Sequence, residues 1–114
     1  MSMNEEKQQV LNTEQLLLMM VAHAGNANAK VFDALDAYEA GNREAAFAIL
    51  EDAGQELLIA QKNQFALMNQ EALGDDVVPS ILMIHAMDIC MTAANSIQYT
   101  KRLLPLLQAN HEVS

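Results

Sequence analysis

Apolar residues recur at helical spacing along most of the chain, and only two short stretches interrupt this pattern. The turn-forming residues fall at Gly41-Asn42 and within 74–79, which contains Gly74 and Pro79. In the segment after the first break, apolar side chains lie on one side and charged side chains on the other, as in an amphipathic helix. The pattern therefore predicts three long helices, at about 13–40, 43–73 and 80–104.

The expected helix boundaries follow from residues that start or stop helices. Thr13 precedes acidic Glu14 and suits a helix N-terminus. Gly41 can end the first helix in the left-handed conformation, and Asn42 can then cap the second. The tight turn makes these two helices antiparallel neighbours. Pro105 is expected to end or kink the third helix.

The composition supports an all-α fold in a single domain. The chain has 114 residues, enough for one core, and 52% of them are apolar but only 4% are aromatic. Alanine, leucine, isoleucine and methionine dominate, and these residues favour packed helices. We expect one three-helix antiparallel bundle over 1–114, with frayed tails at 1–11 and 110–114. Because small domains bury a low fraction of their surface, so apolar a chain is also expected to self-associate.

The third predicted helix carries an unusual polar stripe. Between positions 81 and 94 every residue is apolar except His85, Asp88 and Thr92. Asn95, Tyr99 and Arg102 continue the series, and the six positions are spaced 3, 4, 3, 4 and 3 apart. This spacing is a heptad seam on a helix that is otherwise apolar all round, which is typical of a buried helix. Two partner helices cannot cover it completely, so we expect copies of this helix from other subunits to cover the rest.

Three interpretations of His85 and Asp88 remain open from the spacing alone. The two side chains can contact each other and satisfy both groups inside the core. Alternatively, several copies of Asp88 can meet on a symmetry axis, where they hold protons or bind a cation such as Mg²⁺. In the third interpretation, His85 is a nucleophile in a cleft between subunits and accepts a phosphoryl group.

Charge restricts the classes of partner. Fifteen acidic and six basic residues give a formal charge of −9, which repels nucleic acid and anionic membranes. A basic protein surface is a better match for this charge. The N-terminus lacks the basic and apolar regions of a signal peptide, and no stretch is apolar enough to span a membrane. These features predict a cytoplasmic protein without direct membrane insertion.

The remaining candidate residues have simpler explanations. His23 is interpreted as a packing or surface residue, His111 as part of the C-terminal tail, and Asp75-Asp76 as a solvated loop. The single cysteine, Cys90, cannot form an internal disulfide and is expected to be a small buried hydrophobic residue. No glycine-rich phosphate loop, zinc motif, serine triad or dinucleotide motif is present.

Segment 80–92, with the sequence SILMIHAMDICMT, resembles the active-site helix of the IIA component of the lactose/cellobiose phosphotransferase system. The resemblance extends to Ala60-Gln61-Lys62-Asn63-Gln64, which is similar to the family's Ala-His-x-x-Gln. It also includes the turn at 40–42 and the small residues at 24–27. Altogether it covers about 14–104.

The resemblance implies a homotrimer of three-helix subunits with a phosphorylated histidine, which would be His85. It also implies an aspartate three residues later, Asp88, that meets its copies at the three-fold axis around one divalent cation per trimer, such as Mg²⁺. Members of the family accept the phosphoryl group from the phosphohistidine carrier protein. They pass it to a cysteine of a IIB component, for uptake of a sugar that the sequence does not identify.

The chain departs from the family pattern near the implied site. The family usually reads His-Ala-Gln-Asp-His, whereas this chain has Met87 for the glutamine and Ile89 for the second histidine. Gln61 replaces the histidine of the second helix. Since phosphoryl transfer depends on positioning and electrostatic stabilisation, such changes can slow the transfer or change its partners. A phosphocarrier is the leading hypothesis, and a diverged regulatory or adaptor protein is the alternative.

Overall fold

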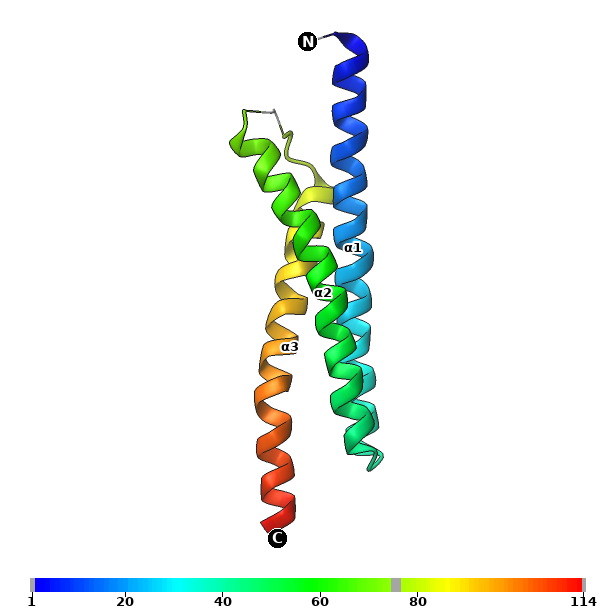
Figure 1. Cartoon of the computed structure of the whole chain (residues 1–114), viewed down its shortest axis with the longest axis vertical. Coiled ribbons are helices and arrows are strands. Elements are labelled where there is room, and N and C mark those ends of the chain that lie inside the picture. Colours follow the sequence, from blue (N-terminus) through cyan, green and yellow to red (C-terminus); the bar gives the residue numbers. More distant parts are fainter. Residues whose placement is uncertain (1, 75–76, 114) are drawn as a thin grey trace.

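The computed structural model describes residues 2–74 and 77–113 and shows a bundle of three helices (Figure 1). They are α1 (Met3–Glu39), α2 (Arg43–Ala72) and α3 (Ile81–Val113). The bundle is long and narrow, 68 × 20 × 19 Å. Because the described residues form helices, turns and loops without any strand, the predicted all-α fold class is confirmed.

Helix α1 begins ten residues before the predicted start, so the expectation of a frayed segment over 1–11 is wrong for 3–11. The cause is a capping box at the N-terminus. The Ser2 hydroxyl accepts a bond from the Glu5 backbone N–H at 3.2 Å, and the Glu5 carboxylate accepts one from the Ser2 N–H at 3.2 Å. Thr13 lies inside the helix and donates its hydroxyl proton to Gln70 Oε1 on α2 at 3.3 Å.

The turn between α1 and α2 is closed by backbone hydrogen bonds. The N–H of Asn42 donates to the carbonyl of Ala37 at 2.8 Å, and that of Gly41 donates to Tyr38 at 3.0 Å. Gly41 has the predicted left-handed conformation, with φ of +91°. Asn42 precedes α2 but its side chain makes no capping bond, so the predicted side-chain cap is wrong. Its carbonyl instead accepts the N–H of Ala46 at 3.0 Å.

Gly41 in this turn and Gly54 in the interior of α2 should respond oppositely to alanine. A Cβ at Gly41 meets nothing within 4 Å, but the positive φ disfavours any side chain, so Gly41→Ala should lower the free energy of unfolding by about 1 kcal/mol. Gly54 lies inside α2, where alanine is the better helix former, and Gly54→Ala should raise the free energy of unfolding by up to about 1 kcal/mol. Urea denaturation of both variants checks the two signs, and equal effects would contradict the conformational explanation.

Helix α3 continues through Pro105 to Val113, so the predicted end near Leu104 and the frayed tail over 110–113 are wrong. Proline removes one backbone N–H, and the carbonyl four residues earlier, at Lys101, loses its helical partner. Both Lys101 and Pro105 are exposed, so water can replace that bond, while Leu104 beside them is buried in the core. At its other end, α3 is capped by Ser80, whose Oγ accepts the Met83 N–H at 3.1 Å.

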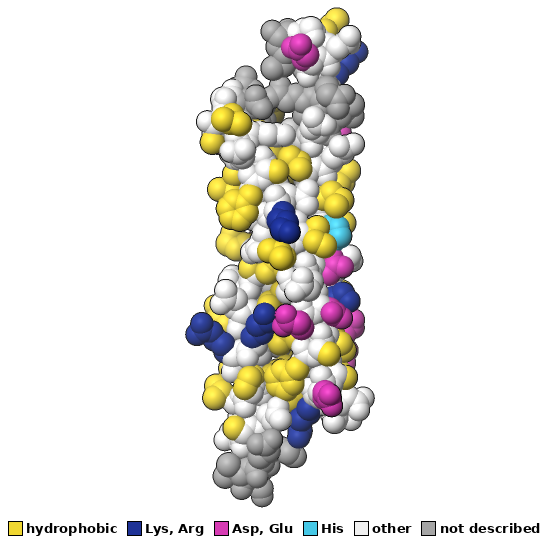
Figure 2. All heavy atoms as spheres, in the orientation of Figure 1, with side chains coloured by type: hydrophobic (Ala, Val, Ile, Leu, Met, Phe, Trp, Pro, Cys, Tyr) yellow, Lys and Arg dark blue, Asp and Glu magenta, His cyan; other side chains and the backbone are white. Residues whose placement is uncertain are grey.

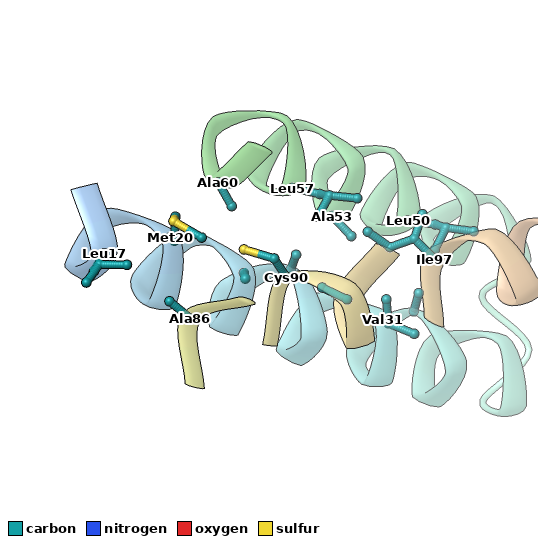
Figure 3. Packing of buried hydrophobic residues seen from close by; sticks show 14 of the residues in the cluster. Leu17, Met20, Val31, Leu50, Ala53, Leu57, Ala60, Ala86, Cys90 and Ile97 are labelled. Atoms are coloured by element: carbon teal, nitrogen blue, oxygen red, sulfur yellow. The ribbon is translucent and has the colours of Figure 1, made fainter. Parts of the chain in front are cut away.

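Small side chains form much of the core between the helices. Eight alanines are completely buried, on all three helices, and the largest fully buried side chains are Met20, Leu67 and Leu104. Alanine lets helix backbones approach closely and bury area without large voids. Figure 3 shows residues of this core, with Met20 on α1, Ala60 on α2 and Ala86 and Cys90 on α3 directed toward the shared interior. Among the described residues, no helix is long and apolar enough to cross a membrane.

Candidate functional site

Helix α3 has two opposite faces. Its inward face consists of Ala86, Cys90, Ala93 and Ile97, each at most 3% exposed. His85 and Asp88 lie on the outward face and are both exposed. The rest of the polar stripe, namely Thr92, Asn95, Tyr99 and Arg102, is exposed as well. The sequence thus placed the stripe on one side of α3 correctly, and within a single chain that side faces solvent.

The structure does not support a His85–Asp88 contact inside the core. Both side chains are exposed, and the described structure contains neither a hydrogen bond nor an ion pair between them. That interpretation is therefore wrong. His85 and Asp88 are one helical turn apart, and because both are exposed, a second molecule can reach the imidazole and the carboxylate together.

Large apolar side chains are exposed on the same part of α3 as His85. Ile81 is 88% exposed, Ile84 67% and Met91 62%. Other apolar side chains are exposed on α2, and Figure 2 shows hydrophobic side chains spread over one face of the molecule among charged ones. An exposed apolar group of this size beside a polar stripe is typical of a protein–protein contact.

The two residues that depart from the family motif on α3 are half-buried and contact the other helices, and Ile89 also lies one helical turn from His85. The Gln64 side-chain amide on α2 donates to the Met87 sulfur at 3.3 Å. The Ile89 Cδ1 lies 3.8 Å from the position that a Cβ on Gly25 of α1 would take. Both residues pack against the core, and Gln61 on α2 is half-buried. Met87, two positions from His85, thus lies on another side of α3, whereas Ile89, four positions from His85, borders the outward face.

His23 has a partner that the sequence did not predict. Its Nδ1 lies 2.5 Å from Glu56 Oε2, which joins α1 to α2, and each side chain is 23% exposed. The hydrogen bond from His23 is the main cause that lowers the pKa of Glu56 from 4.5. The charge of His23, a bond from Asn26 and the charge of Lys30 act in the same direction, against desolvation. Sequence spacing cannot reveal this pair, because it depends on how two antiparallel helices align.

The lowered pKa of Glu56 gives a pH-dependent contribution to stability. A carboxylate whose pKa is lower in the folded state stabilises the fold above its unfolded pKa, and this contribution disappears as the pH falls through the folded pKa. We expect the wild type to lose about 1 kcal/mol relative to Glu56→Gln as the pH falls from 6 to below the ordinary value of 4.5. Thermal unfolding of both proteins across this pH range measures this relative loss of stability. If the stabilities of the two proteins change in parallel with pH, Glu56 makes no such contribution.

A metal ion would find few ligands in a single chain. Among the described residues, no group of three His, Cys, Asp or Glu side chains is close enough to hold one. Asp88 is the one acidic residue of the stripe, and Mg²⁺ takes several oxygen ligands. Asp88 can therefore serve a metal only together with water and other copies of the chain.

The other candidates do not contribute to this face. Cys90 is buried, and desolvation raises the pKa of its thiol, which fits the predicted role as a small hydrophobic residue. The His111 side chain and the loop residues Asp75 and Asp76 lie outside the described part of the structure.

Comparisons with known proteins agree with this geometry. The family model of the lactose/cellobiose-specific IIA subunit of the PTS system matches residues 15–108. The lactose-specific EIIA component of Staphylococcus aureus strain N315 is 36% identical over 102 residues, which are 90% of this chain and 94% of that protein. The oligo-beta-mannoside-specific EIIA component of Bacillus subtilis is 29% identical over 101 residues, 89% of this chain and 92% of that protein.

Solved structures show the same fold. The cellobiose-specific enzyme IIA of Bacillus anthracis superposes with a TM-score of 0.84 at 24% identity, over 90% of this chain and 94% of that one. PtcA of S. mutans superposes with a TM-score of 0.79 at 30% identity, over 90% of this chain and 96% of that one. The fold, the position of the stripe and the match over most of the chain lead to one assignment: this protein belongs to the lactose/cellobiose-specific IIA family of the sugar phosphotransferase system.

Proposed function

We propose that this protein is a cytoplasmic phosphocarrier that holds the phosphoryl group on His85. The observation that carries the proposal is the exposed position of His85 on the outward face of α3, among exposed apolar side chains, in a chain of the IIA family. The donor is the phosphohistidine carrier protein, and the acceptor is a cysteine of a IIB component. The sugar is of the lactose/cellobiose type, in line with the description of the family model and with relatives named for lactose and for oligo-beta-mannosides.

The transfer consists of two displacements at phosphorus. A ring nitrogen of neutral His85 attacks the phosphoryl group, a nitrogen–phosphorus bond forms, and the bond to the donor histidine breaks. In the second step the IIB cysteine thiolate attacks the same phosphorus. A sulfur–phosphorus bond forms, the nitrogen–phosphorus bond breaks, and the imidazole of His85 is free again. Exposure of His85 permits both partners to reach it from the same side. The exposed Ile84 and Met91 offer apolar contacts for that encounter.

The assembly that we propose is a homotrimer in which the Asp88 edges of α3 meet at the axis, while His85 lies in a cleft between neighbouring subunits that the partners can reach. Its support is the heptad spacing of the stripe and the exposed apolar side chains beside it. Asp88 from each subunit would hold one divalent cation such as Mg²⁺ at the three-fold axis, and the cation would neutralise the three carboxylates. The residues fit this ion to the extent that Asp88 is exposed and has no hydrogen bond or ion pair in the described chain.

The exposure of His85 and Asp88 despite the substitutions at Met87 and Ile89 favours a carrier over the adaptor alternative. Their contacts are with Gln64 and with the surroundings of Gly25, so the substitutions change the packing behind α3. His85 and Asp88 remain on the outward face. An adaptor would need no accessible histidine at this position.

Intact-mass spectrometry tests the carrier function directly. The wild type is incubated with phosphoenolpyruvate and the general phosphotransferase proteins, then digested to locate the label. We expect an acid-labile gain of one phosphoryl group per chain, within the peptide that contains His85. No gain with a donor system that labels a known IIA protein, or a gain on another residue, would overturn the proposal.

Asp88→Leu tests the metal separately from the phosphoryl chemistry. The substitution removes the three Asp88 carboxylates of the proposed trimer, so the trimer should be kept or strengthened and bound Mg²⁺ should be lost. His85 should still accept the phosphoryl group. Sedimentation equilibrium and metal analysis measure the two effects. A trimer that dissociates on this substitution would contradict the placement of Asp88 at an axis.

A further inference from the structure

Arg102 occupies the same heptad position as Asp88 on the outward face of α3. Asp88, Asn95 and Arg102 are seven residues apart, and all three are exposed. Residues at one heptad position line one edge of a helix and meet the same partner in a coiled contact. The distance from Asp88 to Arg102 along the helix is about 21 Å, at ~1.5 Å per residue.

Arg102 has no acidic partner among the residues that the structure describes. The positions three and four residues away are Gln98, Tyr99, Pro105 and Leu106, and none of them is charged. The described structure gives Arg102 no ion pair. The chain has a net charge of −9 and only six basic residues, so an unpaired arginine on this edge is an unusual placement.

We propose that three copies of Arg102 converge at the axis and bind one tetrahedral oxyanion. This inference rests on the proposed trimer, because the heptad register carries Arg102 to the axis only if it carries Asp88 there. Three guanidinium groups repel one another when they are close, and an anion between them removes that repulsion. Guanidinium groups also present paired N–H donors that match phosphate and sulfate. The seam would then hold a cation layer and an anion layer two heptads apart.

The neighbouring Lys101 provides a matched control with the same charge. Its Nζ lies 3.6 Å from the position of a Cβ on Gly54, so this side chain follows α2 and not the outward edge. Lys101→Gln and Arg102→Gln each remove one positive charge from adjacent exposed positions. Only the second removes a charge from the seam.

The experiment measures trimer association by sedimentation equilibrium in sodium sulfate and in sodium chloride at equal ionic strength. For the wild type and Lys101→Gln we expect association about tenfold stronger once sulfate exceeds its dissociation constant about tenfold. Arg102→Gln should show no such dependence, and in chloride it should associate more strongly than the wild type because the repulsion is gone. General stabilisation by sulfate acts on all three proteins alike and cannot produce this difference.

Three results would overturn the inference. If all three proteins respond to sulfate equally, the anion does not bind at Arg102. If Lys101→Gln loses the response as Arg102→Gln does, the effect is one of general charge. If the wild type is a monomer in both salts, the proposed trimer fails together with the anion site, whereas a trimer without an anion effect contradicts the anion site alone.

Discussion

Replacing His85 with alanine should abolish phosphoryl transfer completely and leave the fold almost unchanged. The side chain is exposed and makes no hydrogen bond in the described structure, so its removal creates no cavity and leaves no polar group unsatisfied. Without His85, no imidazole remains in the polar stripe of the outward face to accept the phosphoryl group. Incubation with the donor system followed by intact-mass measurement should give no labelled chain, and the circular dichroism spectrum should match the wild type.

His23→Ala is the matched control for this prediction. It also removes a histidine, but one that pairs with Glu56 between α1 and α2. This variant should still be labelled at His85, and its free energy of unfolding should fall by about 1 kcal/mol because an interhelical hydrogen bond is lost. If labelling disappears with His23→Ala but survives His85→Ala, the acceptor is His23 and not His85.

Leu67→Ala should produce the largest loss of stability among single truncations on α2. Leu67 is 2% exposed and belongs to the core, so the substitution removes buried methyl groups and leaves a cavity. Truncations of this kind cost roughly 2 to 5 kcal/mol, a large part of the 5 to 15 kcal/mol that typically stabilises a domain. Urea denaturation at one fixed protein concentration measures the change, since oligomer stability depends on concentration.

The adjacent residue supplies the control. Met68 is 52% exposed, so Met68→Ala removes a side chain of similar size that is only partly buried. Its effect should be below about 1 kcal/mol. Equal losses for the two variants would show that Met68 is buried in the protein as it exists in solution, which would place the outer face of α2 in an interface.

The positions of Met87 and Ile89 in the structure indicate how these two differences from the family motif can affect function. In the sequence, Met87 and Ile89 flank the aspartate and replace polar family residues. In the structure both pack against the core, through Gln64 and near Gly25. Met87 changes the packing behind α3, since it is two positions from His85 and does not share its side of the helix. Ile89 packs against the core and also borders His85, so it makes the surroundings of the imidazole more apolar.

The sequence alone determined the number of helices, the fold class and the stripe on α3. Helical periodicity and the breaks at Gly41 and 74–79 are local properties, so they can be recognised without knowing the packing. The residue types in the stripe also identified His85 and Asp88. Helix ends were less well predicted, because the capping box at Ser2 and the tolerance of Pro105 depend on which side of the helix is exposed.

Only the tertiary structure decided which side chains share a face and which helices meet. It placed His85 and Asp88 outward, which excluded their contact inside the core, and it packed Met87 and Ile89 partly against the core. It also paired His23 with Glu56 across 33 positions of sequence. These outcomes depend on the rotation and relative alignment of packed helices, which arise from the fit of small core residues such as Ala86 and Ala93 and not from the spacing of any single segment.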